Sequence, residues 1–480
     1  MIPTLRPCQD DLIDAIGAKY LEKHRRVLAV ASTGFGKTIV FCALAARAMK
    51  KGKRVVIVAH RMEIIDQISR ALDSFGVKHG RIQAGHTMTD DPIQVCMVIT
   101  LAKRIDKVRE PDLLIVDEAH HAVAASWAAV ASAWTKSRIL GVTATPIRAD
   151  GRGLGEAFDA MVEAIPMSEL IAQGYLSKYT YLAPPTQVDL SHVKTRMGDF
   201  AIDQLADAVD KAVITGDAVQ HYKNYLDGRP AIAFAVTVQH AEHIAEQFRA
   251  AGYRAASVDG KMEKAERRDR IAAIGDGRLN VLTSCDIISE GTDIPVVSGA
   301  LLLRPTKSVG LFLQQVGRVL RPKPDGSAAV ILDHVGNIRM GMPDAPRQWS
   351  LDASKKNIDQ PGASTCKKCF RAFSSFPGWK AKAECNEGQP DGCVLNPTEI
   401  DAALGKSAPE IVAGELKIVT NTPSWADGFN IATVKGSDFA EVIAKADTIE
   451  KMKEIAKSRG YHWRWAIHQM ANRQGREQAA

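Results

Sequence analysis

Residues 26–50 read RVLAVASTGFGKTIVFCALAARAMK, and this stretch decides the fold. The apolar run VLAV predicts a buried strand, and IVFCALAARAMK after residue 38 has the periodicity of a helix. Between them, ASTGFGKT at residues 31–38 fits the pattern G-x-x-x-x-G-K followed by Ser or Thr, with Ala31 in place of the first glycine. A phosphate-binding loop requires this strand-turn-helix context, so the stretch predicts an α/β nucleotide-binding domain.

The residue types in this loop suit a triphosphate and its metal. Gly34 and Gly36 let the backbone curl, so that N–H groups and the positive end of the following helix face the phosphates. Lys37 is expected to reach the β- and γ-phosphates, and Thr38 to offer a hydroxyl to Mg²⁺. Thr33 lies in the same loop and is counted with the nucleotide-binding residues.

A second segment, LLIVDEAH at residues 113–120, narrows the range of reactions that the nucleotide-binding domain could catalyse. Its apolar half predicts a parallel strand that delivers two carboxylates to the sheet edge where ligands bind. Asp117 is placed to hold the metal, and Glu118 to orient and deprotonate the attacking water. His120 has two interpretations: it couples nucleotide state to a second domain, or it satisfies a local hydrogen bond.

The composition is that of a globular protein of several domains. The 480 residues are too many for one core, and 46% are hydrophobic and 24% charged. No apolar run approaches the roughly 20 residues of a membrane span, and the first residues lack the core of a signal peptide, which predicts a cytoplasmic location. A formal charge of +7 permits binding to a polyanion without demonstrating it.

The strand and helix pattern repeats in two series, which predicts two tandem α/β domains with parallel sheets. We expect the first domain at residues 1–160 and the second at 161–340, with the catalytic cleft between them. Beyond Asp333 the pattern dissolves, and the chain is expected to run over the surface as a linker. Residues 341–400 are assigned to this linker and a cysteine module, and residues 401–480 to a basic helical segment.

Four clustered cysteines form a candidate metal site. Cys366 and Cys369 have the spacing of a zinc knuckle, and Cys385 with Cys393 would complete a tetrahedral set, although their spacing is wider than usual. Four separate thiols are the alternative. A small module of this kind would gain its folding energy from structural zinc. The basic, tryptophan-containing segment that follows could contact nucleic acid or pack on the protein body, and a protein partner there stays open.

Further segments carry a resemblance to the superfamily 2 helicases, whose two domains are RecA-like. LRPCQ at residues 5–9 resembles the entry motif of the XPB-like and restriction-enzyme-motor branches, which implies that Gln9 recognises the base of ATP. AHRMEIIDQ at 59–67 resembles a motif that grips the nucleic-acid backbone, which implies contacts from His60 and Arg61, and Thr100 matches the next such motif.

The remaining motifs of the resemblance concern coupling and hydrolysis. Thr143 and Thr145 match the motif that links the ATP site to strand movement. SEGTDIP at 289–295 implies that Gly291 permits a close approach of the backbone and that Asp293 helps to sense the nucleotide. QQVGRVLRP at 314–322 implies coupling by Gln314. The same motif implies that one or both of Arg318 and Arg321 act as arginine fingers on the γ-phosphate.

The sequence therefore predicts a nucleic-acid-dependent ATPase: an ATP- and Mg²⁺-dependent DNA helicase or translocase. The motifs AHRMEI and QQVGRVLR depart from those of DEAD-box RNA helicases, which favours DNA, single-stranded, forked or duplex, as the partner. An RNA helicase, a motor subunit of a restriction or defence complex, and a scaffold that uses ATP only as a conformational ligand are the alternatives.

Overall fold

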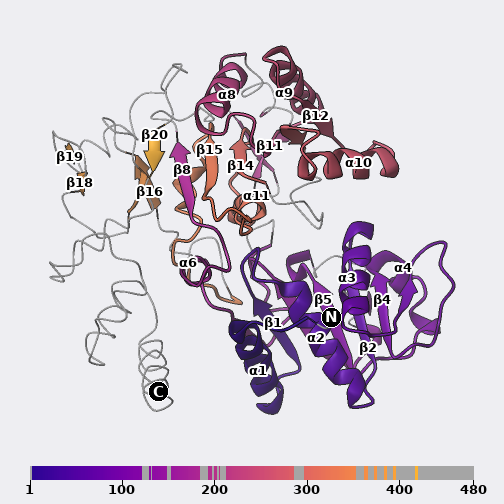
Figure 1. Ribbon diagram of the computed structural model, residues 1–480. Coiled ribbons are helices and arrows are strands. Elements are labelled where there is room, and N and C mark those ends of the chain that lie inside the picture. Colours follow the sequence, from indigo (N-terminus) through magenta and orange to yellow (C-terminus); the bar gives the residue numbers. More distant parts are fainter. Residues whose placement is uncertain are drawn as a thin grey trace.

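The computed structural model describes residues 3–121, 129–130, 132–148, 153–183, 193–196, 199–202, 205, 212–285 and 297–352, and short strands within residues 362–419. Two seven-stranded sheets dominate the described chain, one on each side of a central helix, α11 (Val309–Val319) (Figure 1). The predicted pair of parallel α/β domains is confirmed.

The first sheet has the order β3-β4-β2-β5-β6-β1-β7, and all its neighbours are parallel. Its strands are β1 (Arg26–Val30), β2 (Val55–Ala59), β3 (Gly80–Ile82), β4 (Ile93–Met97), β5 (Leu113–Asp117), β6 (Arg138–Thr143) and β7 (Ala160–Glu163). The helices around it are α1 (Pro7–Leu21), α2 (Lys37–Lys50), α3 (Met62–Ser74) and α4 (Val98–Ala102), with short 3₁₀ turns η1 (Ile105–Lys107) and η2 (Ala119–His121).

The second sheet has the order β12-β13-β11-β14-β15-β8-β20, and only the edge strand β20 is antiparallel. Its strands are β8 (Tyr179–Ala183), β11 (Ala231–Phe234), β12 (Ala255–Val258), β13 (Val281–Ser284), β14 (Gly299–Leu302), β15 (Ala329–Asp333) and β20 (Lys417–Val419). The other helices here are α6 (Met167–Ala172), α8 (Ala212–Tyr225), α9 (Val238–Ala250), α10 (Lys264–Gly275) and η3 (Asn337–Met340).

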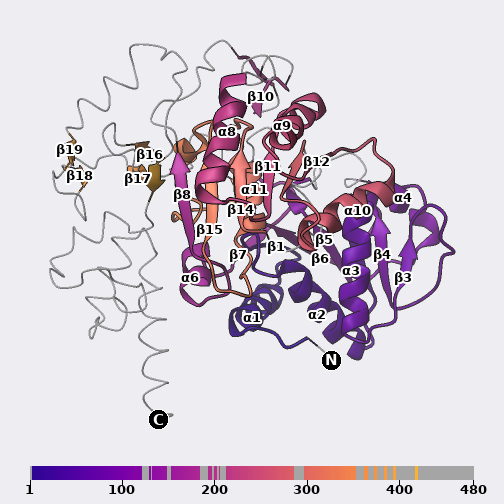
Figure 2. The same cartoon turned by 45° about the horizontal axis from the view of Figure 1, so that its top comes forward.

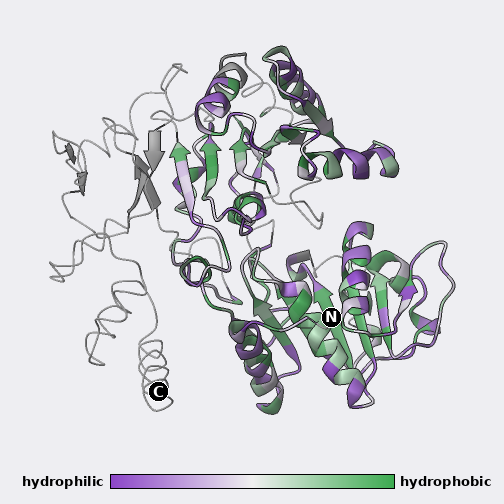
Figure 3. Ribbon diagram, viewed as in Figure 1, coloured by the Kyte–Doolittle hydropathy of each residue, from purple (hydrophilic) through white to green (hydrophobic). Residues whose placement is uncertain are grey.

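Burial explains why these segments became strands. Residues of β2, β11, β13 and β14 are buried throughout, as expected of strands covered on both faces by helices. Figure 3 shows the strands of both sheets mostly in green, while the helices around them also carry hydrophilic residues. Strands β3, β7 and β8 were not predicted, because two of them are short and β8 carries tyrosines and a threonine instead of a purely apolar run.

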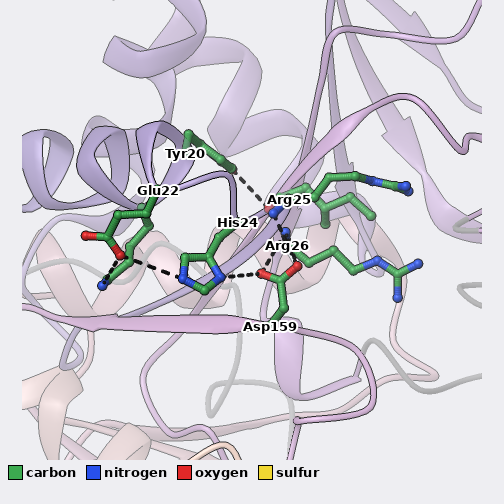
Figure 4. Close-up of polar contacts among 8 residues, drawn as sticks. Tyr20, Glu22, His24, Arg25, Arg26 and Asp159 are labelled. Atoms are coloured by element: carbon green, nitrogen blue, oxygen red, sulfur yellow. Dashed lines mark hydrogen bonds and ion pairs between the residues drawn. The ribbon is translucent and has the colours of Figure 1, made fainter.

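A polar network secures the start of β1 beside the edge strand β7. Asp159 accepts hydrogen bonds from the backbone N–H groups of Arg25 and Arg26, each at 3.2 Å, and lies 3.5 Å from His24 (Figure 4). Tyr20 at the end of α1 donates to the carbonyl of Ile139 in β6 at 3.0 Å. These contacts fix the positions of α1, β1 and β6 relative to one another, and β1 leads directly into the phosphate-binding loop.

The prediction that the chain runs over the surface after Asp333 is wrong for residues 334–343, which are buried apart from the partly exposed Arg339. Met340 and Met342 are buried in the main core, and Trp349 packs against the cores on both faces of the first sheet. Arg347 donates hydrogen bonds to four backbone carbonyls, which ties down an irregular segment. Because no helical or strand periodicity accompanies this burial, the sequence pattern did not reveal it. The chain thereby returns to the first domain, where Gly155 donates to the carbonyl of Leu351.

No helix among the described residues is long and apolar enough to cross a membrane. Two hairpins in the later chain pair β16 (Gly362–Thr365) with β17 (Ala372–Ser375), and β18 (Ala383–Cys385) with β19 (Cys393–Leu395). Of the predicted basic helical segment at residues 401–480, only the strand β20 lies within the described residues.

Candidate nucleotide-binding and hydrolysis site

The loop between β1 and α2 has the shape that phosphate binding requires. Gly34 and Gly36 adopt φ values of +87° and +94°, which glycine accepts without strain. Neither position has room for a side chain: a Cβ on Gly34 would lie 2.6 Å from Leu176, and one on Gly36 would lie 2.5 Å from the Gln9 amide nitrogen. Helix α2 begins at Lys37 directly after the loop, so its N-terminus faces the loop.

Several polar groups of the loop are held ready for a ligand. Lys37 Nζ donates to the carbonyl of Ala31 at 3.2 Å and is close enough to lower the pKa of Asp117. Thr38 lies in the first turn of α2. The hydroxyl oxygens of Ser32 and Thr33 are buried and have no hydrogen-bond partner among the described residues. Buried hydroxyls without partners are costly, which fits a loop that closes around phosphates.

Gln9 is built into the same corner. Its amide nitrogen donates to the carbonyl of Phe35 at 2.9 Å, and its amide oxygen accepts from the backbone N–H of Arg6 at 3.0 Å. Sequence reasoning missed two neighbours. The Arg6 guanidinium lies 4.5 Å from the centre of the Tyr175 ring, and Arg6 Nη1 is buried without a partner among the described residues. Arg6 belongs to the quoted LRPCQ segment, whereas no sequence motif near Tyr175 indicated that it would lie at this site.

The predicted acidic pair stands at the end of β5. Burial, together with the adjacent Glu118 carboxylate, raises the pKa of Asp117 to about 7, against the opposing effect of the Lys37 ammonium group. Glu118 has φ = +50°, a left-handed conformation that side chains rarely adopt, and its N–H donates to Asp117 Oδ1 at 3.0 Å. Strained backbone of this kind concentrates at functional sites.

The residues present fit Mg²⁺ and a water molecule. Asp117 offers a desolvated carboxylate, and Thr38 would add a hydroxyl oxygen, both of the oxygen type that Mg²⁺ prefers. Glu118 Oε2 is buried and accepts no hydrogen bond from the described residues. An added cation would remove the like-charge repulsion that raises the Asp117 pKa.

Three of the four predicted coupling residues, His120, Thr143 and Thr145, are joined by hydrogen bonds. His120 Nδ1 lies 3.4 Å from Glu118 Oε2 and 3.1 Å from Thr143 Oγ1. The Thr143 hydroxyl in turn donates to the carbonyl of Thr145 at 2.9 Å. Thr145 in turn lies against the second domain, because a Cβ on Gly310 in α11 would lie 2.8 Å from Thr145 Oγ1. The structure thus brings these residues together from three segments.

Helix α11 brings the second domain onto the loop. A Cβ on Gly317 would lie 2.5 Å from Thr33 Cβ, so the bare helix backbone touches the phosphate-binding loop. Gln314 is buried in this helix, Arg318 lies in its last turn, and Arg321 follows it. The Arg321 backbone is held by Ser177, whose hydroxyl donates to its carbonyl at 3.0 Å. Gly291 and Asp293 lie outside the described residues.

The predicted nucleic-acid contacts lie at one edge of the first sheet. His60 follows β2, Arg61 precedes the first residue of α3, and Thr100 lies in α4 after β4. Strands β2 and β4 are parallel neighbours, so these residues share the carboxyl edge with the nucleotide site.

The cysteine site is described only in part. Cys366 and Cys369 lie outside the described residues. Cys385 and Cys393 are directly opposite each other in the antiparallel pair of β18 and β19. The buried Cys8, Cys42 and Cys96 are spread through the first domain, where burial raises their pKa.

Two family models match this chain. The model described as type III restriction enzyme, res subunit, covers residues 2–148, and the helicase conserved C-terminal domain covers residues 216–323. They coincide with the sheet that carries the phosphate-binding loop and with the sheet that carries α11.

Relatives agree with these models. The chain is 34% identical to a 51.5 kDa protein of a Lactococcus phage, over 72% of this chain and 74% of the relative. It is 30% identical to a Saccharomyces cerevisiae protein described as the ATP-dependent helicase IRC3, over 66% of this chain and 50% of that protein. It is 24% identical to the DNA 3'-5' translocase XPB2 of Sulfurisphaera tokodaii, over 63% and 76%.

Solved structures share the fold. A fragment of an HsdR subunit of a type I restriction enzyme from Vibrio vulnificus superposes with a TM-score of 0.57 at 20% identity, covering 71% of this chain and 66% of that chain. The chain spans about half the length of its yeast relative. Together with the loop, the acidic pair and the contact of α11 with the loop, these matches show that the chain belongs to the superfamily 2 helicases and carries both halves of their ATP-dependent motor.

Proposed function

We propose that this chain is a DNA helicase or translocase in which hydrolysis of ATP between the two domains drives movement along DNA. The observation that carries the proposal is the contact of α11 with the phosphate-binding loop at Thr33. It sets the helix that bears Arg318 against the site where the γ-phosphate of ATP would lie, and Arg321 follows directly.

The chain's own residues divide the hydrolysis into binding, activation and charge stabilisation. The N–H groups of the loop and Lys37 bind the β- and γ-phosphates. Asp117 and Thr38 would hold Mg²⁺, which would supply charge neutralisation of the phosphates when bound. Glu118 orients the attacking water and accepts its proton. Arg318 and Arg321 stabilise the negative charge that develops on the transferred phosphoryl group.

Base recognition and signal transfer are assigned to residues around this centre. Gln9 would recognise the base, because its amide already lies against the loop at Phe35. His120, Thr143 and Thr145 would transmit the state of the γ-phosphate to α11 through their hydrogen bonds. Gly291 and Asp293 are proposed as nucleotide sensors, and Gln314 as a coupling residue, from the motif resemblance alone.

DNA is proposed as the polymer because the motifs depart from those of DEAD-box RNA helicases, and part of the matches agree with this choice. One relative is named as a DNA translocase, and a structural neighbour and the first family model belong to restriction enzymes. His60, Arg61 and Thr100 would contact backbone phosphates, since they lie at helix starts and loops along one sheet edge. The second candidate, a motor subunit of a restriction or defence complex, is favoured by the same matches.

We further propose four regions: residues 1–160 and 161–340 as the motor domains, 341–400 as a segment with a zinc module, and 401–480 as a basic helical segment. The opposed placement of Cys385 and Cys393 in one hairpin supports a zinc site with Cys366 and Cys369. Metal analysis of the purified protein tests this proposal. One zinc per chain that is lost in Cys366→Ser would support it, and a protein without stoichiometric zinc would refute it.

Displacement of a third strand from a DNA duplex tests translocation, and a tailed RNA duplex of the same sequence serves as the competing substrate. ATP-dependent displacement of the third DNA strand, absent in Lys37→Ala, would support the proposal. Unwinding of the RNA duplex alone would replace it with an RNA helicase. Co-purification with a nuclease or methyltransferase chain would favour the restriction-complex motor.

A further inference from the structure

A charged groove lies between the two domains on the side of α3 and α10. Helix α10 of the second domain faces α3 of the first, as Figures 1 and 2 show from two directions. The groove has a volume of about 590 Å³. It is lined by Met62, Glu63, Asp66, Arg70, Arg81, Lys264, Arg267, Arg268, Ile271 and Ala272.

The charges in this groove are paired across the domain boundary. Its lining contains five cationic side chains and two carboxylates. Arg267 on α10 donates to Glu63 on α3 at 2.5 Å. Asp66, one turn further along α3, lies 3.5 Å from Arg268 of the second domain and 2.8 Å from Arg81 of its own domain. The excess of cations means that the two carboxylates do not neutralise the groove.

The two cross-domain pairs differ in strength. The Arg267 side chain is only 13% exposed and that of Glu63 is 39% exposed, so their ion pair is partly shielded from water. A guanidinium buried in this way is costly to leave without an anion. The Arg268 side chain is 76% exposed, and an ion pair with so exposed a partner contributes little. The contact between Glu63 and Arg267 therefore dominates.

Position links this groove to the proposed path of the nucleic acid. Glu63 lies in the first turn of α3, two residues after Arg61. The first turn of a helix attracts negative charge, whether it comes from a carboxylate or from a phosphate. A guanidinium likewise binds carboxylates and phosphates through the same forked geometry. The carboxylates of Glu63 and Asp66 thus occupy positions that suit backbone phosphates.

We propose that Glu63 and Asp66 form an acidic latch: they hold α10 against α3 through Arg267 and Arg268, and the phosphates of a DNA strand displace them when it binds across both domains. This inference rests on the proposed function, because it requires a nucleic acid as the ligand. The latch closes the groove in the free protein. Binding of the strand exchanges two intramolecular ion pairs for intermolecular ones, so only a polyanion that reaches both domains releases it.

The latch makes a specific prediction for binding of a single-stranded oligothymidylate at one fixed salt concentration. Removal of the competing carboxylate in Glu63→Gln should tighten binding about three- to five-fold, the range expected from breaking one ion pair of ordinary strength. Asp73→Asn is the matched control, because it removes one negative charge from the same helix outside the groove. The control should bind like the wild type.

A double-mutant cycle separates competition from a general charge effect. Arg267→Gln should bind the oligonucleotide more weakly than the wild type. In Glu63→Gln combined with Arg267→Gln, the gain from Glu63→Gln should vanish, because the carboxylate acts through the guanidinium. A gain that persists in the double variant, or a gain equal to that of Asp73→Asn, would overturn the latch.

Small-angle scattering of the full chain without nucleic acid tests the latch independently of the proposed function. Glu63→Gln and Arg267→Gln should each enlarge the radius of gyration relative to Asp73→Asn, because the groove can then open. Unchanged values would overturn the latch. If the wild type binds neither DNA nor RNA, the proposed function fails, and the scattering result still decides whether the two helices are latched.

Discussion

At the scale of single residues, the hydrolysis site combines strain with unsatisfied charge. The left-handed backbone of Glu118 costs on the order of 1–3 kcal/mol, and the hydrogen bond from its N–H to Asp117 offsets part of this cost. The result is a buried carboxylate whose Oε2 accepts no hydrogen bond from the described residues and lies 3.4 Å from His120 Nδ1. We expect a side chain held in this way to act on a water molecule.

The role of Glu118 predicts the effect of an isosteric change. Glu118→Gln keeps the size of the side chain but cannot accept a proton, so turnover of ATP should fall by at least about 100-fold. Binding of ATP should be retained, because the loop and Lys37 are untouched. Steady-state hydrolysis and equilibrium nucleotide binding measure the two quantities. Turnover near that of the wild type would remove Glu118 from the role of general base.

At the scale of elements, α11 joins the domains through its glycines. Phe312, Val316 and Val319 are buried in the core, while Gly310 and Gly317 lie against Thr145 and Thr33 of the first domain. A helix without side chains at the contact can approach the loop closely. The element therefore positions the arginines by its packing.

A single methyl group should disturb this contact. In Gly317→Ala the new Cβ would overlap Thr33, so α11 must move away from the loop, and the turnover number should fall about ten-fold or more through misplacement of the arginines. Gly17→Ala, in α1, is the control, because no atom lies within 4 Å of its added Cβ. Combination of Gly317→Ala with Thr33→Gly should restore part of the rate. An unimpaired Gly317→Ala enzyme would contradict the proposed contact.

Lys323 lies just beyond α11, and close packing there changes the pKa of its side chain. Its Nζ donates to the carbonyl of Val319 at 3.2 Å, and burial lowers the pKa of its ammonium group to about 8. The folded state therefore favours the neutral amine, whereas the unfolded chain keeps the ordinary pKa of about 10.4. The destabilisation is complete below pH 8 and disappears as the pH rises towards the unfolded value.

The difference between wild type and Lys323→Met isolates this effect from other titrating groups. At pH 7 the variant should be more resistant to urea than the wild type. Its advantage should shrink by roughly 1 kcal/mol between pH 7 and pH 9, because the wild-type lysine loses its proton more readily when folded. Urea unfolding of both proteins at the two pH values measures this. A constant difference would mean that Lys323 keeps its proton.

At the scale of the whole molecule, three kinds of contact connect the two domains. The loop contact of α11 lies at the nucleotide site, the pair of Glu63 and Arg267 lies in the α3–α10 groove, and the segment near Leu351 returns to the first domain. An opening of the cleft must break or stretch them together. This arrangement connects the state of the nucleotide to the groove proposed for DNA.

Short motifs in the sequence were sufficient to predict the local features of the fold and of the nucleotide site. The loop at residues 31–38, the acidic pair and the strand pattern are local, so the two parallel sheets and the nucleotide edge were predictable. Contacts between segments that are far apart in the sequence could not be predicted. Two such contacts are that of Tyr175 with Arg6 and that of Arg267 with Glu63. They depend on how the domains dock, and no sequence pattern near these residues predicts them. The burial of Met340 and Trp349 was missed because an irregular segment has no period to detect.

The most direct test is steady-state ATP hydrolysis by the full chain with single-stranded DNA, duplex DNA, forked DNA or single-stranded RNA, with Lys37→Ala as the blank. The account predicts slow hydrolysis by the free protein and a marked stimulation by DNA, which disappears in the blank. Stimulation by RNA alone, or a rate that no nucleic acid changes, would contradict the assignment of this chain as a DNA motor.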